Sequence, residues 1–146
     1  MAPERAAVQG LPVSLVVEAG KVAEFRAALG LGRAEAATHA PPTFPVVLEH
    51  SGTTFAQLLV DQGVDLRRVL HGEERLSYPD GPLRIGDRLA GELRIVADER
   101  RSGRSGPLRM VTVRADLARP DGTVAVTVER VMVVLEGEGS PEGAGG

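Results

Sequence analysis

Three histidines and one glutamate are the side chains of this sequence best suited to acid–base chemistry. They are His39, His50, His71 and Glu49. A histidine titrates near neutral pH, and Glu49-His50 is placed at the head of an expected helix, where the helix end perturbs both groups. Neighbouring helical residues point about 100° apart, however, so this pair does not obviously converge on one substrate. We therefore predict no catalytic residue, and keep Glu49, His50 and His39 as alternatives.

The same inventory argues against a metal or a bound cofactor. The sequence has no cysteine, and its three histidines are spread along the chain without closely spaced carboxylates. A catalytic zinc site needs such a cluster of ligands. The Gly- and Ser-rich run at 102–106 lacks the lysine that follows a phosphate-binding loop. We predict neither a metal nor a cofactor.

Composition excludes two further classes of partner. The formal net charge is −3 and Lys21 is the one lysine, whereas a nucleic-acid binder needs clustered basic side chains. No apolar run approaches the roughly 18 residues needed to span a bilayer, and the first residues lack the apolar stretch of a signal peptide. We expect a soluble, cytoplasmic protein that binds neither nucleic acid nor membrane. Residues 1–10 and 137–146, rich in Gly, Pro, Ala and Glu, are expected to be disordered tails.

The first half of the chain carries the expected helices. A β-branched strand is predicted over 13–17, and the spacing of Val22, Phe25 and Leu29 predicts an amphipathic helix that ends at Gly30. The double proline at 41–42 starts a new element. We expect a short strand over 43–48 and a second helix over 53–62, capped by Ser51 or Thr53 and ended by Gly63.

The second half consists of strand-like segments separated by turn residues. The expected strands are 69–78, 88–100, 108–118 and 123–135, with a longer hairpin loop over 102–107. The sequence Arg-Pro-Asp-Gly-Thr at 119–123 predicts a hairpin turn, which pairs the last two strands antiparallel. A sheet with one buried face needs a helix to cover it. We predict one α+β domain over residues 11–136, in which an antiparallel sheet wraps around a central helix.

Three segments carry a resemblance to a known family. They are the corner Ala-Pro-Pro-Thr-Phe-Pro at 40–45, the stretch Val-Leu-His-Gly-Glu-Glu at 69–74, and the turn Pro-Leu-Arg-Ile-Gly-Asp at 82–87. Together they resemble the hot-dog domains of MaoC-like dehydratases and (R)-specific enoyl hydratases. The resemblance spans about residues 13–135. It is nearest to the N-terminal, non-catalytic type, similar to the HadA and HadC subunits of (3R)-hydroxyacyl dehydratases.

The resemblance implies a function and also an incomplete active site. Catalytic members carry an Asp and a His in the loop before the corner, whereas residues 31–39 here contain no Asp and only His39. It implies a substrate-tunnel subunit that pairs, edge to edge, with a catalytic MaoC-type hot-dog and handles thioesters of acyl carrier protein or coenzyme A. The residues expected to contact substrate are Pro42, Thr43, Phe44, His71 and Gly72.

Two alternatives stay open at this stage. One is a self-sufficient homodimeric dehydratase or thioesterase that uses an atypical site at Glu49 and His50. The other is an acyl-binding module without turnover.

Overall fold

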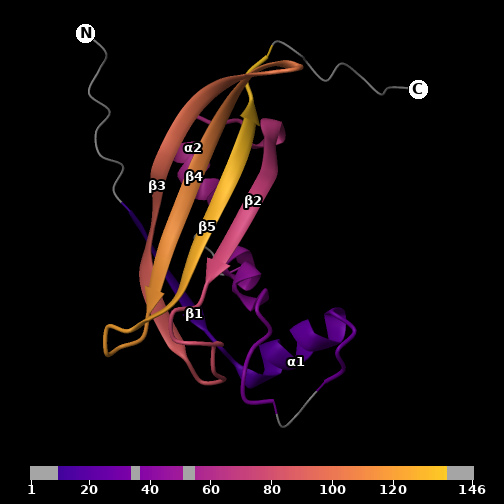
Figure 1. The fold of residues 1–146 in the computed structure, drawn as a ribbon, viewed down its shortest axis with the longest axis vertical. Helices are drawn as coiled ribbons and strands as arrows, with labels where there is room; N and C mark the ends of the chain where they lie inside the picture. The colour runs from indigo at the N-terminus through magenta and orange to yellow at the C-terminus, as the bar shows by residue number, and fades with distance from the viewer. Residues whose placement is uncertain (1–9, 34–36, 51–54, 138–146) are drawn as a thin grey trace.

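The computed structural model describes residues 10–33, 37–50 and 55–137, with only the backbone at 49 and 50 (Figure 1). The predicted tails at 1–10 and 137–146 therefore lie almost wholly outside the described residues. The elements follow in this order: β1 (Leu11–Val16), α1 (Ala19–Ala28), the 3-10 helix η1 (Phe44–His50), α2 (Phe55–Asp61), the 3-10 helix η2 (Leu66–Arg68), β2 (Val69–Ser77), β3 (Arg88–Gly103), β4 (Gly106–Ala118) and β5 (Val124–Leu135).

The five strands form one antiparallel sheet in the order β1-β3-β4-β5-β2, so β1 and β2 are its edges. Buried side chains alternate along β4 with less buried ones, which places Val111, Val113, Ala115 and Leu117 on the inner face. The predicted turn at 119–123 joins β4 to β5, and the Thr123 N–H donates to Asp121 Oδ1 at 2.9 Å. The predicted antiparallel pairing of the last two strands is confirmed.

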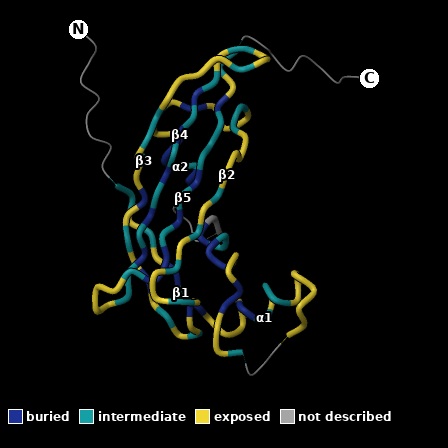
Figure 2. The backbone as a smooth tube through the Cα atoms, viewed as in Figure 1, coloured by how far each residue is buried: buried dark blue, intermediate teal, exposed yellow. Residues whose placement is uncertain are grey.

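The inner face of the sheet is covered by α2, which lies behind the strands in Figure 1. Three buried side chains of this helix, Phe55, Leu58 and Leu59, belong to the same core cluster as the inner-face residues of β4 and β5. Burying each contributes roughly 1.5–3 kcal/mol. The inner part of the sheet is accordingly dark in Figure 2. The predicted α+β class, with a sheet wrapped around a helix, is confirmed.

The expected strand over 43–48 is wrong, because this segment forms the 3-10 helix η1. The Val46 N–H donates to Thr43 O at 3.1 Å, and Pro45 has no N–H for a strand ladder. A short apolar run does not distinguish a strand from a buried helix by its periodicity. Phe44 and Leu48 both point into the core, so η1 extends the helical cover of the sheet.

Two further expectations need correction. Leu29, expected on the buried face of the first helix, is 49% exposed. This helix packs on η1 through Phe25, whose ring meets that of Phe44 edge-to-face at 5.6 Å.

The longer loop expected over 102–107 is a tight hairpin, because β3 continues to Gly103 and β4 begins at Gly106. The proposed caps Ser51 and Thr53 lie outside the described residues, while Gly63, with φ of 73°, follows α2 as predicted.

A buried guanidinium beneath the covering helix is paired with a partly buried carboxylate. Arg130 of β5 is 1% exposed, and its guanidinium carbon lies 4.1 Å from the centre of the Phe55 ring. Its Nη2 donates to Glu74 Oε1 of β2 at 2.9 Å. Burial lowers the pKa of Arg130. The charge is accommodated because it meets both an aromatic face and a carboxylate.

We expect Glu74→Gln to lower the free energy of unfolding by about 3 kcal/mol, because it leaves a buried guanidinium without its carboxylate. Replacing both partners, in Glu74→Gln/Arg130→Met, should cost less than Glu74→Gln alone. Urea unfolding followed by circular dichroism measures both. A double variant less stable than the single one would contradict this account.

Gly91 of β3 has no room for a side chain. A Cβ atom there would lie 2.2 Å from the backbone oxygen of Asp116 on β4, whereas a Cβ at Gly20 in α1 would have no atom within 4 Å. We expect Gly91→Ala to lower the free energy of unfolding by about 2 kcal/mol or more through overpacking. Gly20→Ala is the matched control and should be neutral or stabilising. Equal stability of the two variants in guanidinium unfolding would refute the close approach.

Candidate functional site

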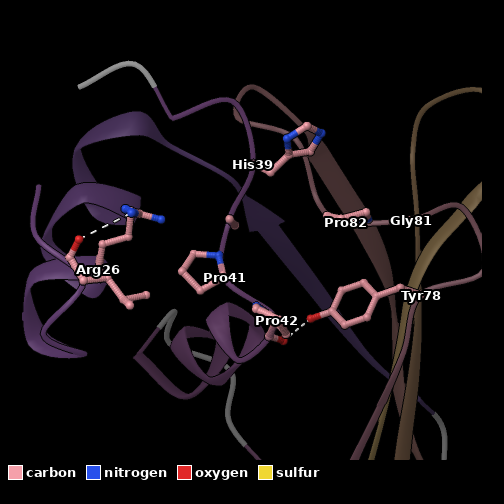
Figure 3. Close-up of a pocket in the computed structure, with 9 residues that line it drawn as sticks. Arg26, His39, Pro41, Pro42, Tyr78, Gly81 and Pro82 are labelled. Carbon is pink, nitrogen blue, oxygen red and sulfur yellow. Dashed lines mark hydrogen bonds between the residues drawn. The ribbon is translucent and has the colours of Figure 1, made fainter. Parts of the chain in front are cut away.

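A cleft of about 460 Å³ lies between the end of α1, the double-proline corner and the turn that follows β2 (Figure 3). Most of its lining is apolar, with the rings of Pro41, Pro42 and Pro82 and the side chain of Leu31. Three polar side chains, those of Arg26, His39 and Tyr78, complete it. Each of the three walls is fixed by a separate set of contacts.

The end of α1 positions the first wall. The Leu31 N–H donates to Arg26 O at 2.9 Å and the Gly30 N–H donates to Ala27 O at 3.0 Å. With Gly30 at φ of 76°, this is the Schellman pattern that ends a helix. Because the motif brings the residue after the glycine back over the last turn, Arg26 and Leu31 lie together at the cleft.

The corner pairs with the segment that precedes β3. The Ala40 N–H donates to Leu83 O at 2.8 Å, and the Ile85 N–H donates to Thr38 O at 2.9 Å. His39 and Arg84 thereby form an isolated antiparallel β-bridge. The hydroxyl of Tyr78 donates to the carbonyl oxygen of Pro42. Pro42 has no N–H, and this bond holds the corner against the end of β2.

Asp87 fixes the third wall from behind. It accepts two bonds from Arg119, Nε to Oδ1 at 3.0 Å and Nη2 to Oδ2 at 3.1 Å, while Arg119 also reaches Asp80 at 2.7 Å. Burial raises the pKa of Asp87, but the hydrogen bonds from Arg119 and from the Arg84 N–H outweigh it and hold the pKa below its usual value. The turn carrying Gly81 and Pro82 is thereby tied to the β4–β5 hairpin.

The chemistry open to this cleft is limited by its polar groups. His39 Nδ1 lies 2.8 Å from the hydroxyl of Thr38. Burial and the negative charge of Glu74 raise the pKa of Tyr78 to about 12, so its hydroxyl stays protonated at neutral pH. The described lining contains no Asp or Glu. Within the described residues, no three His, Asp or Glu side chains gather as a metal site. Among the described lining residues, the cleft therefore offers one imidazole, one guanidinium and one phenol.

The structure places two of the residues singled out from sequence in the cleft, Pro42 and His39. Thr43 is exposed and Phe44 is fully buried against Phe25, and neither lines the cleft. The role of Thr43 and Phe44 in substrate binding stays a prediction. Glu49 and His50 complete η1, but their side chains lie outside what the structure describes.

His71 and Gly72 lie on the edge strand β2 and do not line the cleft. His71 is exposed, with Nε2 3.7 Å from Glu74 Oε2. The register with β5 shifts between His71 and Glu73, which makes Gly72 a bulge, and a Cβ there would lie 3.2 Å from Val131 O. Of the five residues expected to contact substrate, only Pro42 lines this cleft.

Sequence reasoning missed Arg26 and Tyr78 as cleft residues. The only signal for Arg26 was its place in the last turn of a helix ended by glycine, and that signal concerns capping rather than binding. Tyr78 is the one tyrosine of the chain, and it precedes a Pro-Asp-Gly turn. Both enter the cleft only because segments distant in sequence fold together.

Comparison with known proteins identifies the family. A family model described as FAS1-like, dehydratase domain region matches residues 7–128. The chain belongs to this family. A UPF0336 protein of Clavibacter michiganensis subsp. michiganensis is 35% identical, with 78% of this chain and 81% of the relative covered.

Two solved structures from Mycobacterium tuberculosis show the same fold. A chain of the C-terminally truncated HadBC (3R-hydroxyacyl-ACP dehydratase) complex matches with a TM-score of 0.64 and 20% identity, covering 88% of this chain and 98% of that one. HtdX matches with a TM-score of 0.60 and 19% identity, covering 86% of this chain and 50% of the other. The resemblance to MaoC-like hot-dog dehydratases is confirmed. The non-catalytic subtype stays a prediction.

The search for membrane segments covered the same described residues. None of their helices is both long and apolar enough to cross a bilayer.

Tyr78 offers a direct test of the cleft, because no other tyrosine and no tryptophan contributes to its absorbance. We expect its phenol to ionise near pH 12 in the folded protein and near pH 10 in denaturant. The folded state holds the proton more tightly, so stability should fall as the pH rises from about 10 to about 12. Ultraviolet titration, with circular dichroism to check folding, measures this.

Tyr78→Phe is the control for this titration. It should lack the phenolate signal and the fall in stability attributed to Tyr78. Ionisation of the folded protein near pH 10 would show that the hydroxyl is not held in the way described.

Proposed function

We propose that this chain is the non-catalytic, substrate-tunnel subunit of a heteromeric (3R)-hydroxyacyl-thioester dehydratase or enoyl hydratase. It would act in the cytoplasm, in fatty-acid or polyketide metabolism, on thioesters of acyl carrier protein or coenzyme A. The observation that carries the proposal is the composition of the cleft. Its described lining has one imidazole, that of His39, and no carboxylate.

The chemistry of dehydration explains why this composition matters. A base removes the proton from the carbon next to the thioester carbonyl, and an acid protonates the departing hydroxyl, which leaves as water. Both groups must lie within hydrogen-bond reach of neighbouring carbons. In this cleft His39 is bonded to the Thr38 hydroxyl, and the raised pKa of Tyr78 keeps its hydroxyl protonated at neutral pH. A second hot-dog subunit would supply the Asp and His.

The sheet offers an edge for such a subunit. Within the described residues, both β1 and β2 are hydrogen-bonded to a neighbouring strand on one side only. β1 contains Pro12, which lacks an N–H and so weakens that edge as a pairing site, whereas β2 contains no proline. Leu70 on β2 is 55% exposed. Pairing of β2 with an edge strand of the partner would satisfy these backbone groups and continue the sheet.

The comparisons support the presence of a second hot-dog subunit beside this chain. One matching fold is a chain of the HadBC dehydratase complex. The chain also corresponds to half of HtdX, so in that protein the other half is additional structure within one polypeptide. Here a separate chain would fill that place.

The test is hydration of an enoyl thioester, followed by the loss of its absorbance. We expect the purified chain alone to be inactive, and activity to appear on mixing with a catalytic MaoC-type hot-dog from the same source. A partner whose catalytic His is replaced by Ala should give an inactive mixture. In that mixture, Glu49→Gln/His50→Ala in this chain should leave turnover unchanged.

Three results would overturn the proposal. Turnover by the chain alone, abolished by Glu49→Gln/His50→Ala, would establish the self-sufficient enzyme. Complex formation without any gain in the rate or chain-length range of the partner would favour an acyl-binding module without a catalytic role. A catalytic partner that forms no complex with this chain would exclude the heteromer.

A further inference from the structure

We propose that the cleft beside the proline corner is a binding site for a short aliphatic monocarboxylate, whose carboxylate is held by Arg26. This goes beyond the proposed function, because it concerns a free acid bound by this chain alone, with no thioester and no partner. The site lies at the end of α1, and the lining residues used in the argument all belong to the described part of the chain. Two independent features carry the inference.

The first feature is the apolar wall. Pro41, Pro42 and Pro82 present rigid rings, and Leu31, which is 54% exposed, adds an aliphatic side chain to the lining. Figure 3 shows Arg26 on one side of Pro41, with His39, Pro82 and Tyr78 on the other. A volume of about 460 Å³ falls in the range of roughly 300–1,000 Å³ that small-molecule sites occupy. Aliphatic carbons of a ligand would cover this wall and the exposed face of Leu31.

The second feature is an unmatched cation. Arg26 makes one hydrogen bond among the described residues, a long one of 3.5 Å from Nη2 to Leu31 O. Its Nε is buried and has no partner in the same set of residues. A guanidinium carries five N–H donors and matches a carboxylate in a two-bond fork. An anion entering the cleft would therefore find donors that the protein itself leaves unused.

The number of donors favours a carboxylate over a phosphate. Arg26 is the only arginine or lysine among the described lining residues, and Tyr78 already donates to Pro42 O. A phosphate dianion would need further positive charge or backbone N–H groups. A single negative charge on an apolar chain matches one guanidinium at the end of an apolar cleft.

Tyr78 lines the cleft and is the sole tyrosine in a chain without tryptophan, so its fluorescence reports occupancy directly. We expect octanoate to change the Tyr78 emission in a saturable manner. Octanol, with the same chain and no charge, should bind about tenfold more weakly, as expected for losing charge-assisted hydrogen bonds. Acetate, with the charge and no chain, should show no saturation at the same concentrations.

Variants then assign the charge to Arg26. Arg26→Gln should weaken octanoate about tenfold and leave octanol unchanged, while Arg26→Lys should fall between wild type and Arg26→Gln. Arg104→Gln is the matched control, because it removes the same charge from an exposed residue at the β3–β4 turn, at the opposite end of the molecule from α1 (Figure 1). It should leave octanoate binding unchanged.

Equal affinity for octanoate and octanol would overturn the proposal, and so would octanoate binding that is indifferent to Arg26→Gln. Should Arg26→Gln unfold α1, the octanoate–octanol comparison on the unaltered protein and the Arg26→Lys variant still decide. The hydration assay uses a different ligand and a second protein. A failure of octanoate binding would therefore not contradict the subunit proposal, and a failure of the hydration assay would not contradict the carboxylate site.

Discussion

The structure depends on one constraint, that a long sheet must bury its inner face under a short helix. β3 has 16 residues and α2 has seven, which correspond to roughly 50 Å and 10 Å. The helix alone cannot cover such a face, and η1 extends the cover through Phe44 and Leu48. The inner face also carries charges in bonded pairs: Arg130 with Glu74, and Arg109 with Asp98 at 2.9 Å. These paired charges would not be required on an inner face covered entirely by apolar side chains.

The cleft follows from the same constraint. Residues 44–50 form a helix that packs over the sheet. Residues 38–40, just before this helix, therefore do not join the main sheet and pair instead with residues 83–85. This leaves the proline corner between α1 and the turn after β2, where Tyr78 and the Asp87–Arg119 pair hold it. α1, packed on η1 through Phe25 and Phe44, then becomes a wall of the cleft.

The strands were predictable because their alternation is local: every second residue of β4 faces the core, and the turn residues at 119–123 dictate the hairpin. The family was predictable from three short segments. The 3-10 helix was not, since Val46, Val47 and Leu48 favour a strand by propensity and only Pro45 argues otherwise. Arg26 and Tyr78 could not be found by sequence, because their meeting requires the folded corner between them. His71 and Gly72 were recognisable as unusual strand residues, but their distance from the cleft is a property of the sheet order.

The separation of fold from chemistry explains how a hot-dog chain can lack the Asp–His pair. In the loop after α1 the described residues Leu31, Gly32 and Arg33 are exposed, and none belongs to the core cluster. We expect substitutions at these three positions to have little effect on the packing of the sheet, η1 and α2. What the fold does need at this end is the bonding of 38–40 to 83–85 and the Tyr78–Pro42 bond. These bonds shape the corner side of the cleft, while Leu31 of the loop belongs to the rest of its lining.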